Sequence, residues 1–204
     1  MAIVVVDYDM GNVGSIVNMM KKIGHAVAVS SDPATIQRAD RLILPGVGSF
    51  DAGMANIRTR GLVEVLDDKV VKQRTPILGI CLGMQLLGET SGEGGSAGLG
   101  WIPCESIKFS GGSLRVPHMG WNEVAPVDQH WLFEGEPDDM RFYFVHSYHV
   151  VCKDAHHRIA TTSYGLDFSA AVARDHIVGV QFHPEKSHRF GMQLLRNFAG
   201  HTFC

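Results

Sequence analysis

The sequence predicts an α/β fold: an open, doubly wound and mostly parallel sheet flanked by helices, with additional antiparallel strands in the second half. Two observations carry this prediction. In the first half, short apolar runs alternate with amphipathic stretches, the pattern of parallel strands joined by right-handed helical crossovers. After residue 90, β-rich pieces separated by turn residues favour antiparallel or mixed additions to the sheet.

Four apolar, β-rich runs predict the strands of the first half, at 3–8, 25–30, 41–46 and 76–80. Amphipathic stretches between them predict helices at 13–24, 31–40 and 61–74. The middle helix has a clear start, since Ser31 or Asp32 suits the N-cap and Pro33 suits the first turn.

The second half begins with "SGEGGSAGLG" at 91–100 and contains four β-rich pieces, around 106–109, 114–124, 142–151 and 168–182. The final "RFGMQLLRNFAGH" predicts a closing helix because its apolar residues recur at helical spacing. Those residues are Phe190, Leu194, Leu195 and Phe198.

Length and composition limit the possible classes of protein. A chain of 204 residues can bury one sizeable core, and no repeat or linker marks a boundary, so we expect a single domain over 1–204. A formal net charge of −3 without a long run of like charges offers no footprint for nucleic acid or an anionic membrane. We expect a small molecule or another protein as the partner.

The apolar runs and the cysteine spacing indicate the cellular location and whether a metal is expected. No stretch approaches the roughly 18 to 20 apolar residues of a membrane helix, and the apolar start lacks a preceding positive segment. The four cysteines are widely and irregularly spaced, which argues against a zinc knuckle or a disulfide framework. We therefore expect a cytoplasmic protein without metal or cofactor. The cysteines are Cys81, Cys104, Cys152 and Cys204.

The segment "GICLGMQ" places Cys81 between Gly79 and Gly83, directly after the apolar run at 76–80. A strand, a sharp turn and a helix in this order form a nucleophile elbow, in which glycines relieve crowding and one side chain is exposed at the sheet edge. Amide N–H groups at the helix start favour the thiolate. The alternative is a small structural cysteine in a tight turn, and deciding between them requires a base.

A candidate base follows another apolar run, in "GVQFHPEKS". Among 11 histidines, His183 differs in ending a predicted strand with Glu185 two residues on. Residues two apart in extended backbone project to the same side, so Glu185 can orient the imidazole while its other nitrogen faces Cys81. Cys81, His183 and Glu185 are therefore the predicted catalytic residues. Taken alone, "HPE" is equally consistent with a strand end carrying a solvated glutamate.

The segment "LPGVGSF" supplies donors for the oxyanion that acyl transfer generates. It follows a predicted strand, and the amides of Gly46 and Gly48 can turn toward the nucleophile together with the amide of Leu82. The alternatives are an ordinary turn before a helix and a phosphate loop, but the loop has no Walker GK[ST]. "GEGGSAGLG" follows a helix-like segment, so we expect a flexible loop there and no dinucleotide site.

Five segments, "PGVGSF", "GICLGMQLL", "PHMGWNEV", "YFVHSY" and "GVQFHPEKS", together resemble the class I (triad) glutamine amidotransferases. Within that class the sequence is most similar to the HisH family, the glutaminase subunits of imidazole glycerol phosphate synthase. The resemblance covers essentially the whole chain. It implies a flavodoxin-like fold, one type 1 glutamine amidotransferase domain over 1–204, and L-glutamine as the substrate.

The resemblance also implies roles for individual residues. A carboxylate such as Glu93 suits the α-ammonium of glutamine, and Gln85 with backbone groups can hold its other polar ends. The implied reaction is attack of the Cys81 thiolate on the side-chain amide, protonation of departing ammonia by His183, and hydrolysis of the thioester to glutamate. By motif position, the substrate-binding residues are Gly46, Gly48, Leu82, Gln85, Glu93, Ser147 and Tyr148.

Ammonia released into water would be protonated and diluted, so the chemistry requires direct transfer to a second active site. The resemblance implies a heterodimer with a (β/α)8 barrel called HisF, which combines ammonia with PRFAR to give imidazole glycerol phosphate and AICAR in histidine biosynthesis. The family's partner-dependent activity suggests that a peptide of "PGVGS" rotates when the partner binds. Residues implied near this interface are Asn12, Met119, Trp121, Tyr143 and Lys186.

Asp9 stands where the family often has glycine, in "DYDMGN" near the implied partner face. HisH-like paralogues that supply ammonia for sugar amidation in surface-polysaccharide pathways are therefore an alternative. A stand-alone cysteine hydrolase leaves Gln85, Glu93 and "PHMGWN" unexplained. A catalytically silent flavodoxin-like module requires the elbow, "HPE" and the oxyanion loop to be coincidences.

Overall fold

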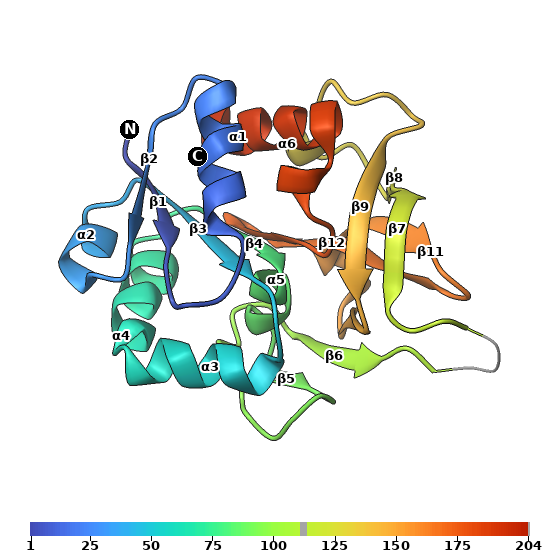
Figure 1. Ribbon diagram of the computed structural model, residues 1–204, viewed down its shortest axis with the longest axis horizontal. Helices are drawn as coiled ribbons and strands as arrows, with labels where there is room; N and C mark the ends of the chain where they lie inside the picture. Colours follow the sequence, from blue (N-terminus) through green and yellow to red (C-terminus); the bar gives the residue numbers. More distant parts are fainter. Residues whose placement is uncertain (111–113, 204) are drawn as a thin grey trace.

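The computed structural model describes residues 1–110 and 114–203, and it confirms the predicted fold class. Cys204 lies outside the described residues. One large sheet runs through the molecule with helices on both faces, and a two-stranded sheet stands beside its second half (Figure 1). The helices are α1 (Val13–Lys22), α2 (Pro33–Gln37), α3 (Phe50–Thr59), α4 (Leu62–Asp67), α5 (Leu82–Leu86) and α6 (His188–Gly200).

The first half of the large sheet is parallel, in the strand order β2, β1, β3, β4, β13. Every residue of β1, β3, β4 and β13 is buried, which explains why these strands read as continuous apolar runs. The strands are β1 (Ile3–Val6), β2 (Val27–Ser30), β3 (Arg41–Gly46), β4 (Ile77–Cys81) and β13 (Ile177–Val180).

The second half continues through β12, β10, β6 and β5, with β11 and β8 attached beside β12. Its pairings are antiparallel except for β5 with β6, as the turn-rich sequence after residue 90 indicates. The strands are β5 (Thr90–Ser91), β6 (Cys104–Lys108), β8 (Ala125–Pro126), β10 (Tyr148–Cys152), β11 (Arg158–Ser163) and β12 (Asp167–Arg174); β7 (His118–Glu123) and β9 (Arg141–His146) form the two-stranded sheet.

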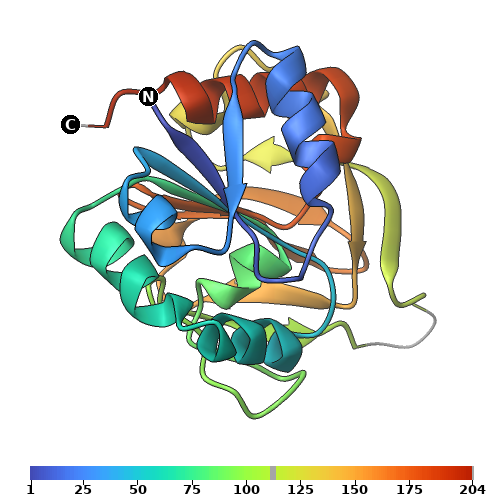
Figure 2. The same cartoon turned by 60° about the vertical axis from the view of Figure 1, so that its left-hand side comes forward.

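The core lies in two layers, one on each face of the sheet. Helices α1 and α6 cover one face and contribute buried residues such as Met20 and Phe198, while α2 to α5 cover the other with residues such as Ile36 and Met54 (Figure 2). Apolar burial on both faces is the main stabilising term for such a layered fold. It also fixes the register of the strands that carry the candidate site.

Local sequence signals account for several element boundaries. Asp32 is the N-cap of α2, its carboxylate accepting from the amides of Ala34 at 3.2 Å and Thr35 at 3.0 Å, so that prediction is confirmed. The predicted helix at 61–74 is α4 followed by a π-helical turn, η1 (Asp68–Lys72), because the backbone pairing widens after Asp67.

Other elements differ from the sequence prediction. Helix α3 and strand β11 were not predicted, although Phe50, Met54 and Ile57 recur at helical spacing in α3. The single runs expected at 142–151 and 168–182 each divide into two strands. Ser147 separates β9 from β10, which belong to different sheets, and a reversal around Asp175 separates the antiparallel pair β12 and β13. A tight chain reversal inside an apolar run leaves little trace in hydrophobic periodicity. Three short 3-10 turns complete the fold: η2 (Trp131–Phe133), η3 (Ala155–His157) and η4 (Pro184–Lys186).

Helix α5 packs directly on β3, and Gly83 makes that approach possible. A Cβ at Gly83 would lie 1.8 Å from the Leu44 carbonyl oxygen, closer than real atoms come. Any side chain there would push the helix away from the strands that position Cys81.

We predict that Gly83→Ala lowers the free energy of unfolding by about 3 kcal/mol or more, because the added methyl has no space. The matched change Gly14→Ala, in α1, meets open space and is expected to be neutral or stabilising by about 1 kcal/mol. Urea unfolding of both variants measures the difference. Equal stabilities would contradict the packing argument.

Candidate active site

Cys81 occupies the last position of β4 and the N-cap of α5. Its backbone has φ of 55° and ψ of −110°, a left-handed conformation that a residue with a side chain adopts only under constraint. Gly79 relieves part of that constraint, since a Cβ there would lie 2.7 Å from the Gly83 carbonyl oxygen. The sharp strand, turn and helix junction of a nucleophile elbow is therefore present. The Cys81 side chain expected to be exposed is instead buried, with 6% of the residue accessible.

Three neighbouring parallel strands end together at this point. Gly46 of β3 is in register with Cys81 of β4, and Val180 of β13 is in register with Ile80. The residues that follow β13, Gln181 to His183, consequently lie beside the Cys81 turn. Carboxyl ends of parallel strands are the usual place for a site in a doubly wound sheet.

His183 and Glu185 form a buried pair, with His183 Nδ1 and Glu185 Oε1 2.8 Å apart and both side chains only 2% exposed. Glu185 lies in η4, which begins directly after His183. The pair therefore fixes the imidazole with Nδ1 toward the carboxylate. The other nitrogen, Nε2, is buried and makes no hydrogen bond within the described residues.

The electrostatics of His183 connect it to Cys81. Burial lowers the pKa of His183, but interactions with the Cys81 sulfur and the Glu185 carboxylate outweigh burial and raise this pKa to about 9. The sulfur is close enough to exert this effect although no hydrogen bond of normal geometry joins it to Nε2. The three side chains predicted from distant parts of the chain are brought together.

The Cys81 sulfur has two further neighbours. Gln181 Nε2 donates to Sγ at 3.7 Å, and Sγ lies 4.0 Å from the Val145 carbonyl oxygen. Gln181 was not predicted as a site residue. Its position does indicate a role, because it is a polar residue inside an apolar strand run, two residues before His183. In the structure Gln181 is fully buried.

The candidate oxyanion loop lies next to the nucleophile. A Cβ at Gly46 would meet the Leu82 Cβ at 2.7 Å and the Gly83 amide nitrogen at 2.9 Å, so the loop start packs against the first turn of α5. Gly48 has φ of +127°, which favours glycine, and it lies on the exposed part of the loop. This conformational freedom is what a rotating peptide requires.

Glu93 and Gln85 have partners within the protein. The Glu93 carboxylate accepts from the Phe50 amide at 2.7 Å through Oε2, at the N-terminus of α3. The Gln85 amide donates to the Tyr148 carbonyl at 3.2 Å and to Gln181 Oε1 at 3.0 Å. Both hydrogens of this NH2 group are used, so Gln85 has only its oxygen left for a ligand.

Ser147 lies between β9 and β10, and Tyr148, whose carbonyl accepts from Gln85, is the first residue of β10. Both are half-buried, and the Ser147 carbonyl accepts from the Phe109 amide at 3.0 Å. The Tyr148 carbonyl thus reaches α5 from the antiparallel half of the sheet, through Gln85.

Four of the five residues expected at a partner interface lie close together, around β7 and β9. Trp121 of β7 is in register with Tyr143 of β9, and their ring centroids are 6.2 Å apart. Lys186 Nζ lies 5.7 Å from the Tyr143 ring centroid, and Met119 is 61% exposed on the same side of β7 as Trp121. Asn12 caps α1, with Oδ1 accepting from Ser15 at 3.3 Å. Trp121 is 47% exposed, so it is not a core aromatic.

Asp9 has φ of 63°, in the left-handed region that favours glycine, and its carboxylate pairs with Arg60. Aspartate is among the side chains that tolerate this conformation. Asp9 is therefore compatible with a backbone conformation that favours glycine.

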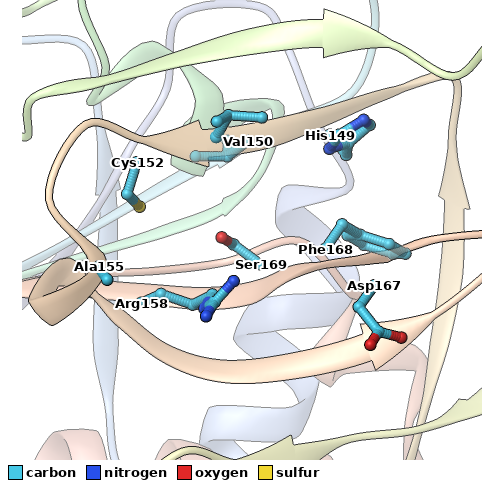
Figure 3. A pocket seen from close by; sticks show the side chains of 9 residues that line it. His149, Val150, Cys152, Ala155, Arg158, Asp167, Phe168 and Ser169 are labelled. Carbon is cyan, nitrogen blue, oxygen red and sulfur yellow. The ribbon is translucent and has the colours of Figure 1, made fainter.

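A pocket of about 150 Å³ lies between β10 and β12 (Figure 3). The two strands share the register pair Val150 and Ser169, and the side chains of His149 and Arg158 are among the 9 that line the space. None of the lining residues belongs to the predicted site, so this pocket is distinct from the Cys81 turn.

Comparison with known families identifies the class of protein to which this arrangement belongs. The family described as glutamine amidotransferase class-I matches residues 4–201. The chain belongs to the class-I glutamine amidotransferases.

Full-length relatives are more specific. The chain is 51% identical to imidazole glycerol phosphate synthase subunit HisH 2 of Pseudomonas aeruginosa, across 96% of this chain and 98% of the relative. It is 45% identical to subunit HisH of Bdellovibrio bacteriovorus, again across 96% and 98%. The predicted resemblance to the HisH family is confirmed.

Solved structures agree on the fold. A glutamine amidotransferase crystal structure gives a TM-score of 0.75 at 19% identity, covering 96% of both chains. The structure of PurLQS from Thermotoga maritima gives a TM-score of 0.71 at 16% identity, covering 97% of both chains.

Two further findings concern metals and membranes. Within residues 1–110 and 114–203, no cluster of three or more His, Cys, Asp or Glu has the arrangement of a metal site. No helix in the described part of the chain is long and apolar enough to cross a bilayer.

The contacts of His183 set the pH at which its imidazole loses a proton. The imidazole stays protonated as pH rises past its ordinary value of 6.5 and loses its proton near 9. In Glu185→Gln we expect the pKa of His183 to fall, because burial is then opposed by the sulfur alone. Histidine NMR titration measures both values, with the exposed Glu123→Gln as the control. A wild-type pKa near 6.5 would contradict the assignment.

Proposed function

We propose that this chain is the glutaminase subunit of imidazole glycerol phosphate synthase, hydrolysing L-glutamine to glutamate and ammonia. The observation that carries the proposal is the juxtaposition of the strained Cys81 turn with the buried His183 and Glu185 pair. The HisH relatives, which match almost end to end, support the pathway. The family match over 4–201 supports one amidotransferase domain.

The first half of the reaction breaks the amide bond. The Cys81 sulfur attacks the side-chain carbonyl carbon of glutamine, forming a C–S bond while the amides of the Gly46 loop and of Leu82 hold the oxyanion. His183, held as a donor by Glu185, gives its Nε2 proton to the departing nitrogen. Ammonia leaves and a γ-glutamyl thioester remains.

The second half regenerates the enzyme. His183, now neutral, takes a proton from water as the water oxygen attacks the thioester carbon. The C–S bond breaks, glutamate leaves and the sulfur returns as a thiolate beside the imidazolium. No redox step or external cofactor is required by this balance.

Substrate binding is assigned to groups around the elbow. The free Oε1 of Glu93 suits the α-ammonium, since its Oε2 already caps α3. Backbone groups of Ser147 and Tyr148 suit the α-carboxylate, and the Gln85 oxygen accepts from the ligand. These roles fit the partners that each side chain already has within the protein.

The proposed partner is a HisF-type (β/α)8 cyclase subunit, to which ammonia passes directly. The exposed Met119 and Trp121, with Tyr143 and Lys186 beside them, form a partly apolar face next to His183. Aromatic and methionine side chains of this kind are enriched in protein interfaces. The proposal includes a cytoplasmic location, as for other biosynthetic enzymes.

The proposal is tested by ammonia release from glutamine, with and without a HisF-type barrel and its nucleotide ligand. We expect release to depend on the complex and to fall at least about 10³-fold in Cys81→Ser, because the nucleophile is lost. Synthase activity supplied with free ammonium should persist in that variant. Cys152→Ser, on β10, is the matched control.

Two outcomes would count against the proposal. Full glutaminase activity in Cys81→Ser would exclude the thiolate mechanism. Activation only by a sugar amidotransferase, and not by the cyclase barrel, would assign the chain to polysaccharide biosynthesis.

A further inference from the structure

The buried amide of Gln181 connects the nucleophile to a hydrogen-bond network. Gln181 is 0% exposed, its backbone amide donates to the Ala170 carbonyl at 2.9 Å, and its side chain lies between Cys81 and Gln85. Nε2 faces the Cys81 sulfur at 3.7 Å and Oε1 faces Gln85 Nε2 at 3.0 Å. Which end of an amide faces a sulfur decides whether it donates a hydrogen bond or repels an anion.

The Tyr148 carbonyl oxygen fixes that orientation, because it can only accept. It lies 3.2 Å from the Gln85 amide, so the group of Gln85 that faces it must be the NH2. The same NH2 then needs an acceptor on Gln181, which must be Oε1. The only remaining end of the Gln181 amide, its NH2, points at Cys81.

A second branch ends on the same carbonyl. His146 Nδ1 lies 2.7 Å from the Tyr148 oxygen, so this nitrogen is the donor and Nε2 is an acceptor. His118 Nδ1 is 3.0 Å from that Nε2, and the Asn122 amide is 3.3 Å from His118 Nε2. The Asn122 amide also donates to the Ser163 carbonyl at 2.8 Å, which fixes its own orientation. The donor and the acceptor of each hydrogen bond in this branch are therefore fixed by the carbonyl groups at its two ends.

This branch remains intact at physiological pH because both imidazoles are neutral. Burial lowers the pKa of His118 to about 4 and the pKa of His146 to about 3. His118 is also held between Phe144 and Tyr164, with ring centroids 4.8 and 4.1 Å away. Two donors then occupy the two lone pairs of the Tyr148 carbonyl, and the carbonyl cannot turn without breaking both bonds.

We propose that Gln181 is a further catalytic residue that donates a hydrogen bond to the Cys81 sulfur, and that His146, acting through the Tyr148 carbonyl and Gln85, is a positioning residue for it. The inference rests on the proposed function, since it assigns a role at the reacting sulfur. Under this proposal the Cys81 thiolate has a hydrogen-bond donor in Gln181 in addition to the His183 imidazole.

The donor acts where the sulfur carries negative charge. Before attack, an N–H aimed at the sulfur holds the thiolate in place beside His183. In thioester hydrolysis, water forms the new C–O bond, the C–S bond breaks and its electron pair goes to the sulfur. The Gln181 amide stabilises the sulfur as this charge develops, so its effect is expected chiefly in the second half of the reaction.

The test replaces Gln181 by Met, which has a similar shape and no donor, and by Glu, which keeps an acceptor for Gln85 but presents an oxygen to the sulfur. Gln193→Met, on α6, is the matched control. The rate at which iodoacetamide alkylates Cys81 is followed against pH by peptide mass spectrometry. Burial raises the pKa of the Cys104 thiol to about 12 and also raises that of Cys152, so these thiols react slowly.

In Gln181→Met we expect the half-maximal alkylation rate to move upward by about one pH unit, and further in Gln181→Glu. In the complex with its cyclase, kcat should fall about 10- to 100-fold while the glutamyl thioester accumulates in the intact mass spectrum. Alkylation profiles and kcat equal to those of Gln193→Met would overturn the inference. Alkylation needs no substrate, so a complex without glutaminase activity would overturn only the proposed function.

The positioning role has its own pair of variants. The side-chain NH2 of Asn can replace the Nδ1 donor of a histidine, so His146→Asn should keep the wild-type alkylation profile, whereas His146→Leu should shift it toward that of Gln181→Met. Thermal unfolding shows that both variants are folded at the assay temperature. Identical profiles for Asn and Leu would exclude the positioning role of His146.

Discussion

The contact between the His183 imidazole and the Glu185 carboxylate is the interaction on which the site depends. Both groups are almost completely buried and 2.8 Å apart, so each provides the hydrogen bond that the other would lack in the interior. The contact fixes one nitrogen of the ring and leaves the other for the sulfur. Without it, only the Cys81 sulfur would oppose the lowering of the His183 pKa by burial, and less of the imidazole would carry the proton that departing ammonia needs.

Neighbouring histidines have pKa values that are shifted in opposite directions. The pKa of His183 is raised to about 9 because anionic partners outweigh its burial, whereas the pKa of His146 falls to about 3 because burial dominates. His183 is therefore suited to moving a proton. His146 and His118 instead transmit a fixed donor and acceptor direction from Asn122 to the Tyr148 carbonyl. Histidine side chains thus have two different roles in this region, and the neighbours of each ring decide which role it has.

The parallel half of the sheet makes this arrangement rigid. Strands β3, β4 and β13 end side by side, and α5 lies so close to β3 that Gly83 cannot carry a side chain. The exposed Gly48 and Trp121 lie outside this frame. The nucleophile is thus held by buried strands, while these two residues remain accessible to a binding partner.

The sequence by itself determined the alternation of strands and helices, the Asp32 cap, the elbow around Cys81 and the local pairing of His183 with Glu185, because each depends on residues close together in the chain. It indicated the family through motifs spread over the whole length. It did not predict α3, the bend that divides β9 from β10 or the chain reversal that divides β12 from β13. Only the tertiary structure showed that Gln181 contacts the sulfur, that both amide hydrogens of Gln85 are donated, and that His118 is hydrogen-bonded to His146. These contacts depend on how neighbouring strands are aligned across the sheets. The periodicity of one strand carries no information about which residues lie beside it.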